Sequence, residues 1–297
     1  MPEYKVQALG ITRWSYPGLG SGFRKLDDDL AVLRAKLYAP NRLEHRLFLL
    51  EHLVLPCLKA QTDKDFKQIF LMGDQLPDVW RDRILALLET VPQAVPVFEP
   101  EGQDTRQLLR ELIPTFRDPA YDVIAQYRID DDDAVATDFI AESRNIFAKM
   151  HSFFEVDGIA GIDFTRGFIM GTSEEGVSLR PVSSRFWAPG LVVFQRSKNV
   201  KSVFEFPHLR IWHDMPSLTW KETPMYIRGA HHDNDSGLGD FARRSKSFSF
   251  NPQNINRYMK RRFGMELRDL RDVWDKNKDY FMESPAAVPV AKQKKAS

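Results

Sequence analysis

The spacing of hydrophobic residues predicts alternating strands and helices in the first half of the chain. Short continuous apolar runs bounded by turn residues are typical of strands that are buried on both faces. Apolar residues three or four positions apart are typical of helices that pack one face against a sheet. The predicted strands cover residues 6–11, 66–72, 94–98 and 121–129, and the predicted helices cover 42–58, 79–91 and 105–112. This alternation indicates an α/β protein with a Rossmann-like sheet flanked by helices.

The second half of the chain has a different pattern. A helix capped by Thr137 or Asp138 is predicted to end near residue 150. Shorter strand-like runs follow at 158–170, 191–196, 203–206, 209–212 and 225–227, and a final basic helix covers 254–279. We predict a single domain over residues 1–283. Residues 284–297 are rich in Ala, Pro and Lys and lack a core-forming pattern, so we expect this tail to be disordered.

Composition narrows the class of protein. Hydrophobic residues make up 43% of the chain and charged residues 28%, as in ordinary globular proteins. The net charge of +1 gives no overall field that would attract nucleic acid. Cys57 is the only cysteine, which excludes an intrachain disulfide and a cysteine-based zinc site. Because the sequence has neither a signal-peptide pattern nor an apolar stretch of about 20 residues, we expect a cytoplasmic protein without a transmembrane segment.

Four consecutive aspartates, Asp130 to Asp133, follow the fourth predicted strand directly. Neighbouring carboxylates repel one another, so such a run is favourable where it is solvated or where a cation offsets the repulsion. Open α/β sheets place their ligands at the carboxyl ends of their strands. Magnesium and manganese ions take carboxylate ligands together with substrate phosphates. The position of the run therefore favours a divalent-cation site over a solvated acidic turn, although a metal-dependent phosphodiesterase would also fit it.

Two segments carry a resemblance to the GT-A glycosyltransferases. Residues 56–66 read PCLKAQTDKDF and lead into IFLMGD at 69–74, which resembles the SL-x-x-QT-x-x-DF passage from helix to strand. Residues 128–134 read RIDDDDA, which resembles the R-L-D-x-DD-A metal motif. Together with GITRWSY at 10–16, these segments are similar to the bacterial family described as putative rhamnosyltransferases. The aspartate motif alone is weak, whereas both motifs in this order are fairly specific.

The resemblance covers about residues 5–280 and implies a GT-A fold, a mixed sheet flanked by helices. It divides the domain into a nucleotide-binding half at about 1–135 and an acceptor half at 136–283. In this family pattern, Asp130 and Asp132 fall on the acids that bind Mn²⁺ or Mg²⁺. Asp133 lies beside them and is expected to support the metal or contact the ribose of the nucleotide.

The same resemblance implies residues for the nucleotide. Asp74 matches the acid that reads the nucleobase, and a carboxylate there can accept the imide N–H of uracil or thymine. Thr12 and Arg13 fall where this superfamily meets the nucleotide. Arg128, and with less support Arg106, is a candidate for binding the phosphates, because guanidinium groups match phosphate oxygens in a bidentate way. These features suit a UDP- or dTDP-sugar donor.

The segment that begins His231-His232 resembles the late HG-x-N loop that supplies a third metal ligand in many GT-A enzymes. We expect His232, rather than His231, to be this ligand. An inverting transfer also needs a base for the acceptor hydroxyl. Asp214 is the candidate, with Glu205 and Asp163 behind it, although no motif marks any of these three acids.

The expected function is metal-assisted transfer of a sugar from a UDP- or dTDP-sugar to a glycan or lipid-linked acceptor. The family name points to rhamnose, and an inverting reaction is expected if rhamnose is the donor sugar. The enzyme could act in the cytoplasm or at the inner face of the membrane. Two other functions stay open. One is a metal-dependent nucleotidyltransferase or phosphodiesterase, which the lack of a second acidic motif for a two-metal site disfavours. The other is a non-catalytic module that binds a nucleotide sugar or a glycan.

Overall fold

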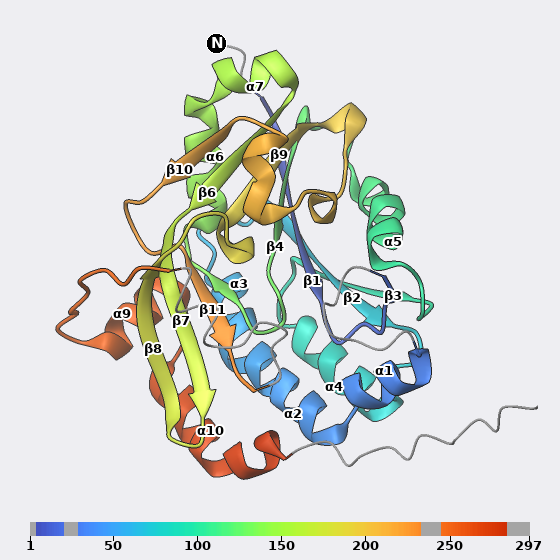
Figure 1. Cartoon of the computed structure of the whole chain (residues 1–297), viewed down its shortest axis with the longest axis vertical. Coiled ribbons are helices and arrows are strands. Elements are labelled where there is room, and N and C mark those ends of the chain that lie inside the picture. Colours follow the sequence, from blue (N-terminus) through green and yellow to red (C-terminus); the bar gives the residue numbers. More distant parts are fainter. Residues whose placement is uncertain (1–3, 21–28, 233–244, 284–297) are drawn as a thin grey trace, which may run out of the picture.

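The computed structural model of the 297-residue chain describes residues 4–20, 29–232 and 245–283. A seven-stranded sheet with the order β10-β6-β9-β4-β1-β2-β3 forms its centre (Figure 1). All neighbouring strands in this sheet are parallel except where β9 pairs with β4 and β6. The strands are β1 (Val6–Arg13), β2 (Phe66–Gly73), β3 (Ala94–Glu99), β4 (Val123–Arg128), β6 (Ile159–Phe164), β9 (Leu191–Arg196) and β10 (Ser217–Trp220).

A second sheet of four strands has the order β5-β11-β7-β8. Its strands are β5 (Ala134–Val135), β7 (Arg166–Ser173), β8 (Gly176–Ser183) and β11 (Tyr226–Ala230). The short strand β5 follows the four aspartates directly and pairs antiparallel with β11, with Ala134 opposite Ile227. This pairing brings the end of β11 close to the aspartates, although the two segments are far apart in the sequence.

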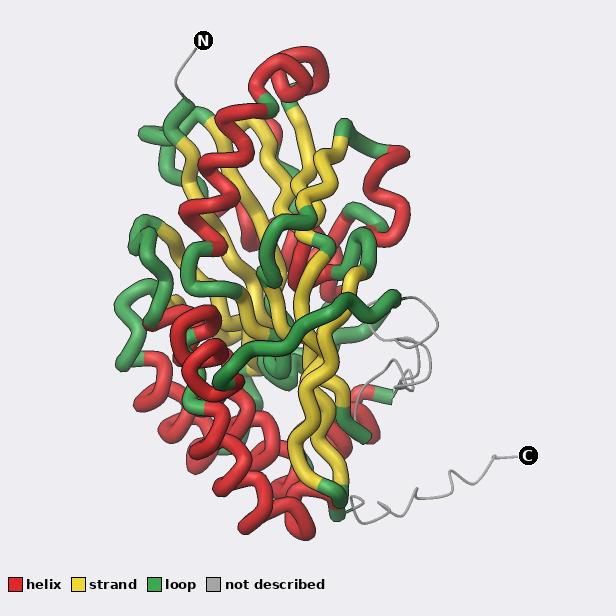
Figure 2. The backbone as a smooth tube through the Cα atoms, turned by 90° about the vertical axis from the view of Figure 1, so that its left-hand side faces the viewer, coloured by secondary structure: helices red, strands yellow, loops and turns green. Residues whose placement is uncertain are grey.

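Helices lie on both sides of the central strands, as Figure 2 shows. They are α1 (Leu30–Leu37), α2 (Pro40–Leu49), α3 (Leu55–Lys59), α4 (Asp78–Leu88), α5 (Thr105–Leu112), α6 (Phe139–Lys149), α7 (His151–Asp157), α9 (Ile255–Phe263) and α10 (Leu267–Met282), with the π-helical turn η1 (Leu50–Val54) joining α2 to α3. Successive residues of a strand point to opposite faces of a sheet. In β2, accordingly, Phe70 and Met72 join the core that includes α2 and α6, whereas Ile69 and Leu71 join the core that includes α5.

The predicted fold class, a mixed α/β sheet flanked by helices, is confirmed. The four strands predicted in the first half correspond to β1, β2, β3 and β4. The continuous strand predicted at 158–170 is instead two strands, β6 and β7, which belong to different sheets. The domain bounds stay a prediction, and the tail at 284–297 lies outside the described residues.

Two segments predicted as strands, 203–206 and 209–212, are 3-10 helices: η5 (Val203–Glu205) and η6 (His208–His213). Ser202 and Glu205 form a capping box. The hydroxyl of Ser202 accepts from the backbone N–H of Phe204 over 3.3 Å, and the carboxylate of Glu205 accepts from the backbone N–H of Ser202 over 3.1 Å. These local hydrogen bonds stabilise a helical turn and override the strand preference of the aromatic and branched residues. The two predictions were therefore wrong.

The final helix is also interrupted. Gly264 has φ of +71° and ends α9 in a left-handed conformation, which glycine adopts readily. A Cβ atom there would lie 2.5 Å from the carbonyl oxygen of Pro56, so the residue also permits a close approach to α3. The chain then turns into α10, which packs against α2.

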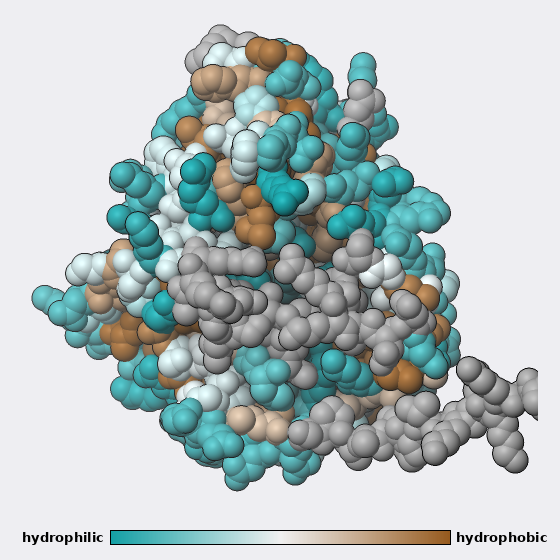
Figure 3. All heavy atoms as spheres, viewed as in Figure 1, coloured by the Kyte–Doolittle hydropathy of each residue, from teal (hydrophilic) through white to brown (hydrophobic). Residues whose placement is uncertain are grey.

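Hydrophilic residues dominate the face seen in Figure 3, and hydrophobic ones form separate patches on it. Cys57 is fully buried, as its apolar neighbours in the sequence suggest. Among the described residues, no helix combines the length and the apolar character needed to cross a membrane.

Candidate active site

The strand order defines where a ligand can bind. Strand β1 lies between β4 on one side and β2 and β3 on the other, and all four strands are parallel. Their carboxyl ends therefore share one edge, and the strand order reverses between β1 and β4, where open α/β sheets form their binding crevice. Arg13 ends β1, exposed Asp74 follows β2, and Asp130 follows β4. The structure thus brings these predicted site residues to the same edge of the sheet.

The four aspartates form a tight and largely buried turn. The backbone N–H of Asp133 donates to the carbonyl oxygen of Asp130 over 3.1 Å. The exposed fractions of Asp131, Asp132 and Asp133 are only 7%, 5% and 3%. Burial raises the pKa of Asp131, and burial together with the charges of Asp132 and Asp130 raises the pKa of Asp133 well above its usual value. A solvated acidic turn does not describe this segment.

Arginine side chains surround the aspartate turn. Nη1 of Arg46, from α2, lies 2.8 Å from Oδ1 of Asp131 and 3.5 Å from Oδ2 of Asp132. Nη2 of Arg128 lies 3.2 Å from Oδ2 of Asp130. Although burial acts in the opposite direction, the charges of Arg128 and Arg13 hold the pKa of Asp130 below its usual value. The carboxylate charge is therefore partly offset by the protein itself.

Two arginines, Arg13 and Arg128, lie beside this turn. The guanidinium carbons of Arg13 and Arg128 lie 5.3 and 5.0 Å from the centroid of the Phe204 ring. Cations are attracted to the face of an aromatic ring, so Phe204 helps to hold both groups at the edge of β1 and β4. Guanidinium groups held in this way can bind phosphate oxygens.

The second sheet completes the site. The backbone N–H of Gly229, in β11, donates to Oδ1 of Asp133 over 3.1 Å. A Cβ atom on Gly229 would lie 2.4 Å from the backbone oxygen of Asp132, so only glycine allows this approach. Directly after β11, Nε2 of His231 lies 2.9 Å from Oδ2 of Asp132. The pairing of β5 with β11 thus places an imidazole on the aspartate turn.

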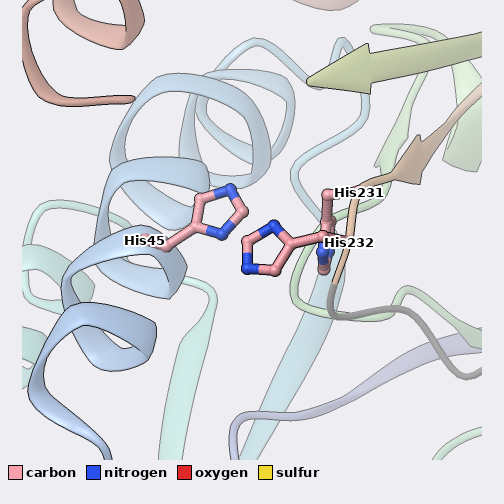
Figure 4. Close-up of side chains that lie close together, drawn as sticks. All are labelled: His45, His231 and His232. Carbon is pink, nitrogen blue, oxygen red and sulfur yellow. The ribbon is translucent and has the colours of Figure 1, made fainter. Parts of the chain in front are cut away.

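Three histidines gather beside the turn: His45 from α2 and His231 and His232 after β11 (Figure 4). One potential ligand atom from each lies within 4.8 Å of the others. The ring of His45 is 4.9 Å from that of His231 and stacks at 5.9 Å on that of His232. Burial, followed by the charges of His231 and Arg46, lowers the pKa of His45 well below its usual value, which keeps the imidazole neutral.

Sequence reasoning missed His45. It lies on an amphipathic helix among apolar residues, and no motif or spacing distinguishes it from a histidine of the core. It is fully buried, and neither ring nitrogen has a hydrogen-bond partner among the residues that the structure describes. Only the packing of α2 against the end of β11 reveals its neighbours.

Two other predicted site residues, Thr12 and His232, form no hydrogen bond or ion pair with the described residues of the aspartate turn. Thr12 is fully buried, and its hydroxyl accepts a hydrogen bond from Nε2 of Gln68 over 3.0 Å, so its side chain is engaged within the protein. His232 is exposed and lies against His45, whereas His231 contacts Asp132. Both residues stay predictions as ligand contacts.

The three candidate bases have distinct surroundings. Asp214 is exposed at the end of η6 and precedes the amino end of β10, and its side chain forms no hydrogen bond or ion pair with the described residues of the aspartate turn. Glu205 belongs to the capping box and forms an ion pair of 3.1 Å with Arg110. Asp163 is fully buried in β6, where burial raises its pKa to about 7. The structure does not bring any of these acids into the cluster.

Asp163 instead supports a strained residue near the site. Its Oδ1 accepts from the backbone N–H of Phe186 over 2.7 Å, and Phe186 has φ of +55°, which is unusual for a residue with a side chain. The carbonyl oxygen of Phe186 lies 2.7 Å from Nδ1 of His208. Burial and the charge of Arg128 lower the pKa of His208 to about 4, so its ring is neutral near pH 7.

The protein is therefore an α/β protein with a largely parallel central sheet. Its acidic site lies at the carboxyl ends of the strands, where the strand order reverses between β1 and β4. A family model described as putative rhamnosyl transferase matches residues 7–242. The chain therefore belongs to the putative rhamnosyl transferase family, a family of glycosyltransferases, as its motifs indicated. No curated protein sequence matches the chain.

Several solved structures are similar to the chain. For residues 1–349 of S. aureus TarS, the identity is 10%, the coverage is 76% of this chain and 60% of that chain, and the TM-score is 0.37. For TarS in complex with UDP-GlcNAc, the corresponding values are 8%, 78%, 60% and 0.36. For a putative glucose-1-phosphate thymidylyltransferase from Bacillus anthracis in complex with sucrose, they are 12%, 83%, 98% and 0.36.

The chain spans 60% of the length of these TarS structures. Because the identities and TM-scores are low, the fold class rests on the strand order of the chain itself, and the family rests on the family model.

Proposed function

We propose that this protein transfers a sugar from a UDP- or dTDP-sugar to a glycan or lipid-linked acceptor, with rhamnose as the first sugar to test. The observation that carries the proposal is the buried aspartate turn at the reversal of the strand order, bordered by Arg13 and Arg128, in a member of the rhamnosyl transferase family. Arginines on one side and carboxylates on the other suit a nucleoside diphosphate and its counter-ion.

In this proposal, Arg13 and Arg128 bind the diphosphate, since both guanidinium groups lie against the ring of Phe204 at the carboxyl ends of β1 and β4. Asp74, exposed at the end of β2, accepts the imide N–H of uracil or thymine. The backbone at Thr12 lines the same end of β1. Asp133 is held by the N–H of Gly229 and supports the ribose side of the site.

The donor atoms around the turn fit a divalent cation, Mn²⁺ or Mg²⁺. Asp130 and Asp132 provide carboxylate oxygens. Burial, followed by the charges of Asp132 and Asp130, raises the pKa of Asp133, and a cation would counteract this shift. A histidine of the 231–232 pair is the third ligand, for which the sequence favours His232 and the contact with Asp132 favours His231. When bound, such an ion offsets the charge that develops on the leaving diphosphate.

The acceptor hydroxyl must lose its proton in an inverting transfer. Asp214 is exposed and could be reached by a large acceptor, whereas Glu205 is engaged in a capping box and Asp163 is enclosed in the sheet. We therefore retain Asp214 as the base to test first.

The test is release of the nucleoside diphosphate from a panel of UDP- and dTDP-sugars, including dTDP-rhamnose, by the wild type and the Asp132→Asn variant. Asp157→Asn, an exposed acid on α7, is the matched control. Release of UDP or dTDP that the control retains and Asp132→Asn loses supports the proposal. Release of pyrophosphate or a nucleoside monophosphate would point to the nucleotidyltransferase or phosphodiesterase alternative. Binding of a nucleotide sugar without release of any product would point to a binding module.

A further inference from the structure

We propose that His45, His231 and His232 together hold the cation of this site, so that of the two ions considered above the site prefers the transition metal Mn²⁺ to Mg²⁺. The inference rests on the proposed function for its role in sugar transfer. Metal binding by the three imidazoles can, however, be measured without any nucleotide.

The geometry supports a shared ion. One nitrogen from each of the three rings lies within 4.8 Å of the others (Figure 4). Imidazole nitrogens bind metals such as Zn²⁺ at about 2.0–2.1 Å, so nitrogens that share a tetrahedral ion are about 3.4 Å apart. Shifts of about 1 Å in the side chains, without a change of backbone, would close this difference. His232 is exposed, so at least one of the three rings can move readily.

The burial of His45 is the strongest indication that the histidine cluster binds a metal ion. Both ring nitrogens are buried and lack a hydrogen-bond partner among the described residues. A buried polar group left unsatisfied costs about 1–3 kcal/mol. The rings of Trp274, at 5.4 Å, and Phe281, at 5.5 Å, pack around His45 and offer it no polar partner of their own. In Figure 4 the imidazole points from α2 toward His232, so a metal between them would satisfy it.

The aspartate turn contributes negative charge to the same site. Oδ2 of Asp132 lies 2.9 Å from Nε2 of His231, and such carboxylate–histidine contacts orient the imidazoles that bind metals. Arg46 also lies beside the turn, and its closest ion pair is with Asp131 at 2.8 Å. Nη1 of Arg46 also lies 3.5 Å from Oδ2 of Asp132, so this carboxylate is shared between Arg46 and His231 and carries negative charge to the edge of the histidine cluster.

The donor set determines which ion is preferred. Magnesium binds oxygen ligands and keeps much of its water, whereas imidazoles suit manganese less than cobalt or zinc, in the order of Irving and Williams. A site with three imidazoles should therefore bind Co²⁺ and Zn²⁺ more tightly than Mn²⁺, and Mg²⁺ very weakly.

The experiment titrates chelator-treated full-length protein with Co²⁺, Mn²⁺ and Mg²⁺ in the absence of nucleotide. The readouts are the visible absorption of bound Co²⁺, the heat of binding and the metal content by mass spectrometry. The variants are His45→Phe, which suits the aromatic surroundings of His45, and His232→Ala, which changes an exposed side chain. His52→Gln, in η1 and outside the cluster, is the matched control.

We expect one Co²⁺ per chain in the wild type and in His52→Gln, with affinity reduced about 100-fold in His45→Phe and in His232→Ala. No Co²⁺ binding by the wild type, unchanged binding by both variants, or equal affinity for Mg²⁺ would overturn the inference. If the variants bind Co²⁺ normally while sugar transfer proceeds with Mg²⁺, only the inference fails. If Co²⁺ binds through the histidines but no nucleoside diphosphate binds, the proposed function fails and the metal site stands.

Discussion

Replacing Asp163 by asparagine tests how strongly the interior of the central sheet perturbs a carboxylate. Asp163 is fully buried, and burial raises its pKa from 3.8 to about 7. Between these two pH values the folded protein keeps a proton that the unfolded chain has released. The ionisation of Asp163 therefore costs no stability below about pH 4, and the cost grows as the pH rises to about 7.

The magnitude follows from the linkage between protonation and folding. Each pH unit over which the folded state binds one more proton than the unfolded state removes about 1.4 kcal/mol of stability. From pH 5 to pH 8, the folded carboxyl group is protonated over about two of these units, which amounts to about 3 kcal/mol. Asparagine does not ionise, and its carbonyl oxygen can still accept the N–H of Phe186.

The assay is urea unfolding of the wild type, Asp163→Asn and the exposed control Asp157→Asn at pH 5, 6, 7 and 8. The free energy of unfolding of Asp163→Asn should gain about 3 kcal/mol on that of the wild type between pH 5 and pH 8. Asp157→Asn should track the wild type. A difference between Asp163→Asn and the wild type that stays constant over this range would refute the reasoning, because it would mean that Asp163 is ionised throughout.

Three further predictions concern the site and its frame. Gly229→Ala would place a Cβ atom 2.4 Å from the backbone oxygen of Asp132. The substitution should therefore lower the free energy of unfolding in urea by about 1–3 kcal/mol and weaken the binding of UDP or dTDP. Unchanged stability would contradict the close approach. Arg128→Ala should weaken diphosphate binding at least about tenfold by calorimetry, since hydrogen bonds to charged groups contribute about 1.5–3 kcal/mol. Arg268→Ala, which removes an exposed arginine on α10, is the control and should leave this binding unchanged. Equal effects of the two substitutions would count against a phosphate role for Arg128. Ser202→Ala removes one half of the capping box at η5 and should cost about 1 kcal/mol in the same unfolding assay, and a neutral effect would show that η5 does not depend on its cap.

The first half of the fold was predictable largely because three of its strands, β1, β2 and β4, are buried on both faces. Continuous apolar runs such as those of β2 and β4 have few other structural solutions, and the turns that follow them end the strands clearly. The same reasoning placed the aspartate turn at the carboxyl edge of the sheet, since a polar run directly after a buried strand must lie there.

The second half was less predictable because local hydrogen bonds and long-range pairing decide it. The capping box at Ser202 and Glu205 converted a strand-like segment into a helical turn. The break at Thr165 separated β6 from β7, and it depends on which sheet each part joins, which no local pattern encodes.

The site combines residues that a local sequence motif identifies with residues that only the tertiary structure brings together. Arg128 ends β4 and Asp130 follows it, so a motif could identify them together. His45 comes from α2 and meets His231 only because β5 pairs with β11, so their proximity arises from tertiary structure. Asp214 was selected because it follows residues 209–212, which were predicted to form a strand. These residues form the 3-10 helix η6 instead, so the sequence pattern did not fix where Asp214 lies.

The central claim is that the aspartate turn holds a cation against the diphosphate of a nucleotide sugar. Calorimetric binding of UDP, dTDP, GDP and ADP, with and without Mn²⁺, to the wild type and to Asp132→Asn tests it most directly. We predict that UDP or dTDP binds only with Mn²⁺ and that Asp132→Asn, folded as judged by thermal unfolding, loses this binding. Failure of every nucleoside diphosphate to bind under either condition, or equal binding by the variant, would contradict the account.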